Sequence, residues 1–311
     1  MVKIAVQDIN DNVPEFRPDV YNVTLSQDHP TSSPFLIVSA EDEDSGDYGV
    51  VEYRLASGNE DGYFQMDSRT GDVSLYSGLD QFPLFFQLKV EARDRDGRRG
   101  SREAVVNIHV ALETRDVPVF DKQVYTFRVS EDSSTFSKIG KISPSYQRDA
   151  RLFIYPEELK KHFDLNPRTG DLSTRSTLDH ETRSKYLLNI GAVSTSGHIG
   201  YCQVRILVTD VNDNAPEFQP TLGLVYIPEN SPVNTIVSAN TALDDDTGDN
   251  GDVRYRLVRD PANYFTIDED TGVLRTNKVS LSTQSTFSPI NFFQLACRIF
   301  FNFLHLKIVH E

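Results

Sequence analysis

The chain has 311 residues, of which 38% are hydrophobic and 25% are charged, a balance typical of folded globular domains. Its net charge of −15 argues against a nucleic-acid-binding protein, since the sequence also has no Lys/Arg-rich block. Its two cysteines, Cys202 and Cys297, supply neither a disulfide framework nor a metal-ligand spacing.

An acid–amide cluster occurs twice in the chain. Residues 6–16 read VQDINDNVPEF, and residues 208–218 read VTDVNDNAPEF. Such a polar run cannot be a buried strand, and its carboxylate and amide oxygens are ligands that a hard cation such as Ca²⁺ prefers. The residues before the first cluster, MVKIAVQD, alternate like a strand and contain no apolar signal-peptide core. We therefore expect the chain to be part of a longer protein.

A longer motif recurs at intervals of about one hundred residues. It has the form Phe-x-x-Asp/Asn-x-x-Thr-Gly and begins at Phe64, Phe163 and Phe265. A Pro-x-Phe pair recurs in step with it, at Pro14, Pro118 and Pro216. These repeats predict the end of one copy and its linker at 1–15, full copies at 16–117 and 118–215, a partial copy at 216–279, and an atypical tail at 280–311.

Each copy contains short runs in which apolar and polar residues alternate, such as VEYRLAS, FQLKVEARD and AVVNIHV in the first. Gly, Asp, Asn and Pro residues separate these runs, a pattern that predicts an antiparallel β-sandwich. The glycine that ends each Phe-x-x-Asp motif is expected to take a positive φ in a hairpin.

The tail does not continue the repeat. Its polar residues follow a helical spacing, at Asn291, Gln294, Arg298, Asn302 and His305. We do not expect a membrane span, since charged residues such as Arg298 would each cost about 2.5–3.5 kcal/mol at the centre of a bilayer.

Together these motifs resemble cadherin repeats, over residues 1 to 279. The linker Asp-x-Asn-Asp-Asn, the stretch Asp-x-Asp-x-Gly, the sequence Leu-Asp-His-Glu and the motif Phe-x-x-Asp-x-x-Thr-Gly occur in the family's order. The resemblance implies an all-β fold of tandem seven-stranded Greek-key (immunoglobulin-like) sandwiches, with the third repeat truncated. It also implies Ca²⁺ bound between neighbouring repeats.

The linker near residue 212 has more of the family's ligands than the other two linkers, enough for an outer, a middle and a third ion. The implied ligands are Glu131, Asp179 and Glu181 upstream, the Val211 carbonyl, Asn212, Asp213 and Asn214 in the linker, and Asp244, Asp246 and the Asn250 carbonyl downstream. The first linker keeps only the ligands of the downstream site, because the repeat that would supply the other acids is expected before residue 1, so one weakly bound ion is expected there. These ligands are Asn10, Asn12, Asp42, Asp44 and Asp94.

The linker near residue 116 departs from the family pattern at nearly every ligand position. Gln27 and Phe82 replace upstream acids, Arg115 lies in the linker, and Ser194 replaces a downstream Asp. We therefore expect a calcium-free joint, which would act as a hinge between the first and second repeats.

Two other classes of protein fit the sequence poorly. An EF-hand needs a Glu at the twelfth loop position, but counting from Asp42 or Asp244 reaches Tyr53 or Tyr255. The catalytic motifs His-Glu-x-x-His and Gly-x-Ser-x-Gly are absent, as are phosphate-binding glycine loops, so we do not expect an enzyme.

The resemblance implies calcium-dependent cell–cell adhesion by the extracellular part of a plasma-membrane protein. The partners would be other cadherin ectodomains, homophilic or heterophilic, on the same or an adjacent cell, and neither nucleic acid nor a small-molecule substrate. The alternative is a non-adhesive calcium-stiffened spacer, or a heterophilic recognition arm of a large surface receptor. In either case Asn22, in the sequon Asn-Val-Thr, is a predicted glycosylation site.

Overall fold

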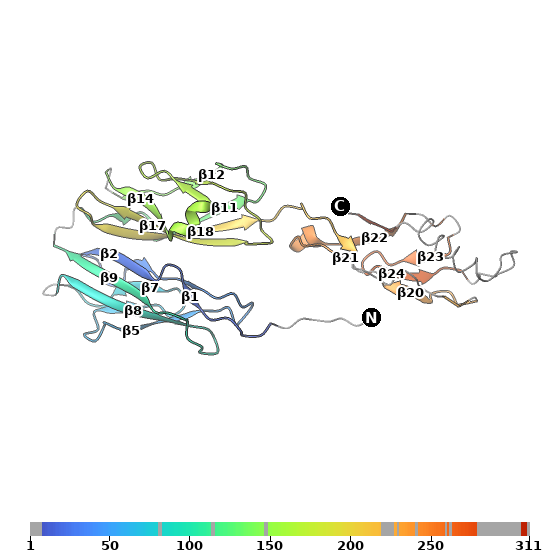
Figure 1. Ribbon diagram of the computed structural model, residues 1–311, viewed down its shortest axis with the longest axis horizontal. Coiled ribbons are helices and arrows are strands. Elements are labelled where there is room, and N and C mark those ends of the chain that lie inside the picture. The colour runs from blue at the N-terminus through green and yellow to red at the C-terminus, as the bar shows by residue number, and fades with distance from the viewer. Residues whose placement is uncertain are drawn as a thin grey trace. The chain divides into compact units, whose positions relative to one another are not determined.

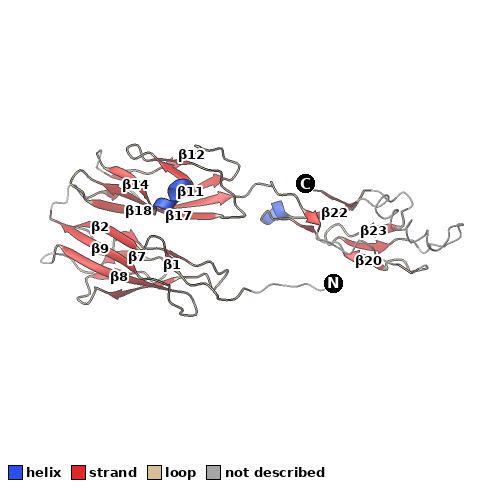
Figure 2. Ribbon diagram, in the orientation of Figure 1, coloured by secondary structure: helices blue, strands red, loops and turns tan. Residues whose placement is uncertain are grey.

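The computed structural model describes residues 8–79, 83–112, 116–145, 149–218, 227–228, 230–239, 242–258, 260, 263–278 and 306–309. These residues are mostly in strands, turns and loops, with short 3-10 turns such as η2 (Glu157–Lys161) and η3 (Gly248–Gly251) (Figure 2). The predicted all-β class is therefore confirmed. The chain divides into two compact units, Ile4–Thr209 and Asp210–Glu311 with Met1–Lys3.

The first repeat is a sandwich of a four-stranded and a three-stranded sheet (Figure 1). Its larger sheet has the order β2-β9-β8-β5, in which β2 runs parallel to β9. The smaller sheet has the order β3-β7-β6, and a short pair, β1–β4, lies at the end that carries the first linker. The strands are β1 (Glu15–Phe16), β2 (Val20–Ser26), β3 (Pro34–Ile37), β4 (Ala40–Glu41), β5 (Glu52–Ser57), β6 (Phe64–Met66), β7 (Asp72–Leu75), β8 (Phe85–Arg93) and β9 (Ala104–Ala111).

The second repeat has the same architecture, with sheets β11-β18-β17-β14 and β12-β16-β15 and the short pair β10–β13. Its strand β11 is again parallel to the last strand, β18. The seven main strands of each repeat thus confirm the predicted sandwich. The strands are β10 (Val119–Phe120), β11 (Val124–Ser130), β12 (Lys138–Lys141), β13 (Pro144–Ser145), β14 (Arg151–Tyr155), β15 (Phe163–Leu165), β16 (Asp171–Thr174), β17 (Lys185–Val193) and β18 (Ile199–Thr209).

The third repeat, in the second unit, keeps the three-stranded sheet β20-β24-β23 and the short pair β19–β21. From the tail, the structure describes only β25, which pairs antiparallel with β22. The helical stripe predicted at 291–305 lies outside the described residues. The strands are β19 (Glu217–Phe218), β20 (Ile236–Ala239), β21 (Ala242–Leu243), β22 (Arg254–Leu257), β23 (Phe265–Ile267), β24 (Val273–Thr276) and β25 (Leu306–Val309).

The recurring Thr-Gly motif builds the same hairpin in all three repeats. In the first, the Asp67 carboxylate accepts hydrogen bonds from the N–H groups of Arg69 and Thr70, both at 2.9 Å. Gly71 then takes a φ of +75°, and a Cβ there would lie 2.0 Å from the carbonyl oxygen of Val38. The equivalent glycines of the other repeats also have positive φ, which confirms the structural role predicted for this residue.

The first two repeats each have a hydrophobic core between their sheets, and the two repeats also touch. Tyr201, from the second repeat, is 6% exposed and belongs to the core cluster of the first. Phe153, Tyr155 and Ile199 pack against the same cluster. The expectation of a hinge between the first and second repeats did not include these contacts. The linker residues Thr114 and Arg115 lie outside the described residues.

Candidate functional site

The first linker folds onto the loop that carries Asp42 and Asp44. Asn12 donates two hydrogen bonds to Asp44 Oδ1, from its backbone N at 3.1 Å and from Nδ2 at 2.6 Å. The Asp44 backbone N in turn donates to Asp42 Oδ1 at 3.0 Å. Gly49 closes the loop, and a Cβ there would lie 2.2 Å from the Asp44 carbonyl oxygen. Three predicted ligands are thus brought together.

The second unit builds the same loop from Asp244 and Asp246. Asn214 donates to Asp246 Oδ1 from its backbone N at 3.2 Å and from Nδ2 at 2.8 Å. The Asp246 N donates to Asp244 Oδ1 at 3.1 Å, and a Cβ on Gly251 would lie 2.3 Å from the Asp246 carbonyl oxygen. Every hydrogen bond described for the first loop has a counterpart here, so the sequence specifies the same loop structure twice.

The sequence analysis missed one acid in each linker. Asp8 Oδ2 accepts a hydrogen bond from the N–H of Ser45 at 2.9 Å. Asp210 Oδ2 accepts one from Thr247 N at 3.2 Å and one from Asn250 Nδ2 at 2.8 Å. Both are the first Asp of the Asp-x-Asn-Asp-Asn cluster, so their place in the motif could have identified them.

The remaining ligands predicted at the first linker, Asn10 and Asp94, also meet. Asn10 Nδ2 donates to Asp94 Oδ2 at 2.9 Å, and Asp94 is 2% exposed. Arg98 Nη1 donates to the Asn10 carbonyl at 2.5 Å and also contacts Asn10 Oδ1. A guanidinium therefore already contacts an oxygen predicted to bind the ion.

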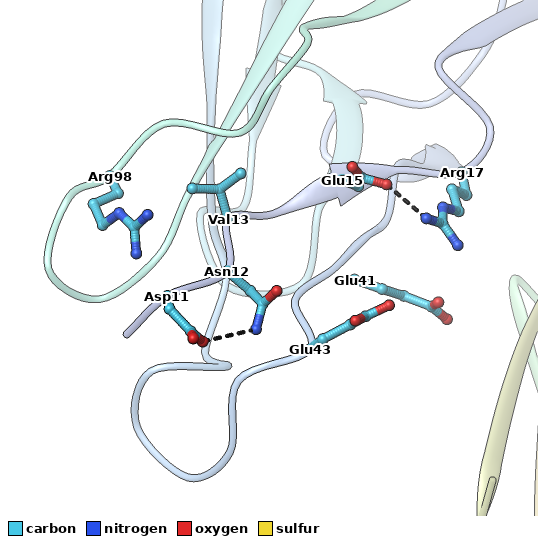
Figure 3. Close-up of a pocket in the computed structure, with 8 residues that line it drawn as sticks. All are labelled: Asp11, Asn12, Val13, Glu15, Arg17, Glu41, Glu43 and Arg98. Atoms are coloured by element: carbon cyan, nitrogen blue, oxygen red, sulfur yellow. Dashed lines mark hydrogen bonds and ion pairs between the residues drawn. The ribbon is translucent and has the colours of Figure 1, made fainter. Parts of the chain in front are cut away.

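The electrostatics of this loop suit a cation. Burial raises the pKa of Asp42, and the charges of Asp44 and Asp94 raise it further. The Asp42 Oδ2 atom is buried and has no hydrogen-bond partner among the described residues. Beside the loop, Asp11, Glu15, Glu41 and Glu43 line a pocket of about 280 Å³ with Asn12, Val13, Arg17 and Arg98 (Figure 3). Buried carboxylate oxygens that lack donors are chemically suited to Ca²⁺.

The upstream ligands predicted for the linker near 212 lie at one end of the second repeat. The Glu131 N–H donates to the Thr209 carbonyl at 3.2 Å, and Glu131 Oε2 accepts from His180 N at 2.6 Å. Thr182 donates to both carboxylate oxygens of Asp179, which lowers the pKa of that group. Glu181 follows in the same turn.

In the second unit, the other ligands predicted there are Val211, Asn212, Asp213 and Asn250. Val211 is partly buried, while Asn212 and Asp213 are exposed. Asp213 Oδ1 accepts a hydrogen bond from Asn214 Nδ2 at 3.1 Å. Asn212 Nδ2 donates to the carbonyl of Asn250 at 3.4 Å, the oxygen predicted as a ligand.

Two of the residues predicted to replace calcium ligands around residue 116 occupy the same structural positions as ligands of other linkers. Gln27 donates its N–H to the Ala111 carbonyl at 3.0 Å, the place that Glu131 takes in the second repeat. Ser194 Oγ accepts from His198 N at 3.2 Å, where Asp94 Oδ1 accepts from Arg98 N in the first. Neutral side chains thus occupy two ligand positions. Phe82 and Arg115 lie outside the described residues.

Asn22, the predicted glycosylation site, is exposed on β2. Its Oδ1 accepts a hydrogen bond from Asn107 Nδ2 at 2.9 Å. Among the residues that the structure describes, no helix is long and apolar enough to cross a membrane.

Comparisons with known proteins agree with this architecture. The Cadherin domain family matches residues 21–111, 125–209 and 224–299, so the third match runs past residue 279, where the sequence predicts the repeat to end. Protein dachsous from Drosophila melanogaster is 33% identical over 290 residues, which are 88% of this chain and 8% of that protein. Human Protocadherin Fat 4 is 33% identical over 279 residues, which are 88% of this chain and 6% of that protein.

The chain thus spans less than a tenth of the length of these relatives. Among solved structures, mouse Cadherin-23 EC22-24 is 27% identical and has a TM-score of 0.50. The match covers 89% of this chain and 92% of that one. Because the family matches most of the sequence and each of its three predicted repeats, the chain belongs to the cadherin family.

Proposed function

We propose that this chain is part of a cell-surface ectodomain that mediates cell–cell adhesion and is stiffened by Ca²⁺ between its repeats. The observation that carries the proposal is the duplicated loop, in which Asn12–Asp44–Asp42 and Asn214–Asp246–Asp244 have matching hydrogen bonds. Two buried acids, Asp44 and Asp246, are 8% and 7% exposed. A buried carboxylate normally requires compensation, which a bound cation would provide.

The linker near residue 212 would bind the most calcium, because both repeats beside it contribute acids. Its proposed ligands are Glu131, Asp179, Glu181, Val211, Asn212, Asp213, Asn214, Asp244, Asp246 and Asn250. Asp210 joins this set, since it lies in the same motif and bonds to the ligand loop. The first linker would hold one weakly bound ion through Asn10, Asn12, Asp42, Asp44 and Asp94, in competition with Arg98.

Calcium would act as a structural ion in this protein. Without it, the carboxylates repel one another and oppose a rigid linker. With it, ions that both repeats coordinate would resist bending. Extracellular calcium modules bind with dissociation constants of roughly 10⁻⁴ to 10⁻³ M, so they are largely loaded at millimolar calcium.

The proposed partners are other cadherin ectodomains, on the same or an adjacent cell. Beads coated with the chain should aggregate in calcium and disperse in chelator if the chain itself adheres. Beads that bind calcium but never aggregate would instead establish the alternative, a calcium-stiffened spacer or recognition arm. A chain that binds no calcium in a calorimetric titration would refute both.

A further inference from the structure

The outer face of the larger sheet of the second repeat carries an apolar patch, beside a row with the polar residues Asn189 and Gln203. The patch, called the apolar face below, consists of Phe153, Tyr155, Gly191, Ile199 and Tyr201. In a sandwich, the side of a sheet that points away from the core normally carries polar residues. Here the register places Phe153 opposite Gly191, and Gly191 opposite Tyr201, in one row across β14, β17 and β18. A Cβ on Gly191 would lie 2.1 Å from Phe153 Cζ, so the missing side chain makes room for the ring. The rings of Phe153 and Tyr201 meet edge to face at 6.0 Å.

The first repeat has an ion cluster at the matching positions. Arg54 is opposite Glu91 in its register, as Phe153 is opposite Gly191. The Glu91 carboxylate accepts Arg54 Nη2 at 2.8 Å and Arg99 Nη2 at 3.0 Å.

Two glycines fix the correspondence between the repeats. Gly100 and Gly200 lie against the carbonyls of Pro14 and Pro118, with Cβ distances of 2.4 and 2.1 Å. Arg99 directly precedes Gly100 and Ile199 directly precedes Gly200, so Arg99 corresponds to Ile199. Arg54, Glu91 and Arg99 of the first repeat are therefore replaced by Phe153, Gly191 and Ile199 in the second.

The first repeat covers this apolar face. Tyr155 Oη donates to the Val20 carbonyl at 2.8 Å, and Ile199 N donates to Thr24 Oγ1 at 3.0 Å. The ring of Tyr21 meets those of Tyr155 and Tyr201 edge to face, each at 6.4 Å. Strand β18 packs against β2 and β3, which are edge strands of the two sheets of the first repeat. The contact therefore buries an edge strand and an aromatic face together.

The ends of the two repeats that lie far from their joint also meet. Glu41 lies opposite Glu15 in the strand pair β1–β4, at the end of the first repeat next to the first linker. Arg183 follows the turn in which His180 Nδ1 bonds to the Val208 carbonyl, at the end of the second repeat that leads to the third. Arg183 Nη2 and Glu41 Oε1 are 2.6 Å apart. In an extended tandem, these two ends would be separated by the length of both sandwiches.

We propose that the first two repeats form a closed, folded-back pair in solution, with the apolar face of the second repeat as a dedicated docking surface for the first. Most of the contacts are aromatic packing and neutral hydrogen bonds, and none of the residues named in them is a proposed calcium ligand. Closure therefore requires no calcium, and the inference is independent of the proposed function. The face is also unavailable to other partners while the pair is closed.

The test restores the polar pattern of the first repeat to the second, in the full chain. Phe153→Arg with Gly191→Glu introduces the pairing that the first repeat already tolerates, without changing the net charge. Hydrogen exchange read at the Ile199 amide reports closure, because this N–H donates across the contact. We expect exchange roughly tenfold or more slower in the wild type than in the double variant, equally in calcium and in chelator. X-ray scattering should show a larger radius of gyration for the variant.

The controls separate opening from unfolding. Tyr76→Arg changes an exposed tyrosine of the first repeat, so it should leave Ile199 protected. Other amides of β17 and β18 should stay protected in the double variant. If they do not, the double variant has unfolded, and Tyr155→Phe replaces it in the test, because this change removes only the hydroxyl that bonds to Val20. Rapid exchange at Ile199 in the wild type would overturn the proposal. So would unchanged Ile199 protection in a folded double variant.

Discussion

Replacing Asp246 with Asn should remove calcium-dependent stabilisation from the third repeat while preserving its fold. The Asp246 carboxylate accepts hydrogen bonds from Asn214 N and Nδ2, at 3.2 and 2.8 Å. An Asn has the same size and keeps one acceptor oxygen, but it loses the charge that Ca²⁺ would bind. In chelator, removing one of several crowded carboxylates relieves repulsion, so the variant should melt at or above the wild-type temperature.

The expected magnitude follows from the affinity of extracellular calcium modules. With a dissociation constant of roughly 10⁻⁴ to 10⁻³ M, about 10 mM calcium stabilises a repeat by about 1.4–2.7 kcal/mol for each ion. For a domain of about 60–100 residues, this is a rise in Tm of roughly 6–20 °C. Calorimetric melts in calcium and in chelator measure the rise, with Asp252→Asn, an exposed acid outside the ligand loop, as the control. If Asp246→Asn keeps the calcium shift of the wild type, Asp246 is not a ligand and the reasoning from the duplicated loop is wrong.

Three further outcomes are expected. Arg98→Ala should tighten calcium binding at the first linker several-fold in calorimetric titrations, because Arg98 bonds to the Asn10 oxygens; an unchanged affinity would show that the guanidinium does not compete. Burial raises the pKa of Tyr201 to about 12, against about 10 in an unfolded chain. Its contribution to folding is therefore complete below about pH 10, and about 3 kcal/mol is lost as the pH rises to about 12. Tyr201→Phe should flatten this alkaline loss in denaturant titrations, and equal losses in both proteins would contradict the assignment. Secreted protein should carry a glycan at Asn22, and mass spectrometry that finds this residue unmodified would count against the prediction.

The parts of the fold that the sequence predicts well are those specified by residues close together in the chain. The hairpin at Asp67–Gly71 is an example, because its hydrogen bonds and its positive φ involve neighbouring residues. The contact between Asn12 and Asp44 joins residues farther apart in the chain, yet it is predictable once the repeat is recognised. Asp8 and Asp210 were not predicted, although each is the first Asp of the same Asp-x-Asn-Asp-Asn motif.

The contact between the first two repeats could not be predicted from local pattern alone. Phe153, Tyr155 and Tyr201 alternate with core residues, so the sequence does reveal aromatic side chains on an outer face. It does not reveal what covers them, because the edge at Val20–Thr24 is distant in the chain and has no motif of its own. The loss of calcium ligands near residue 116 therefore led to the prediction of a hinge. The proposal of a closed pair rests instead on the packing of the two sandwiches against each other.

The two joints of this chain would respond differently to calcium. If ions hold the linker near residue 212, its stiffness falls as calcium falls, since the bound fraction follows the free concentration. Burial of Tyr201 against the first repeat carries no such dependence, because aromatic packing is insensitive to a divalent ion at millimolar concentration. Gly191 lies where the first repeat has Glu91, and this exchange allows the two joints to differ in their response to calcium. It removes the charge that Glu91 places on the outer face of the first repeat, and it makes room for the Phe153 ring. A joint that has lost its calcium ligands can remain fixed only if another contact replaces them, and in this chain the apolar face does so.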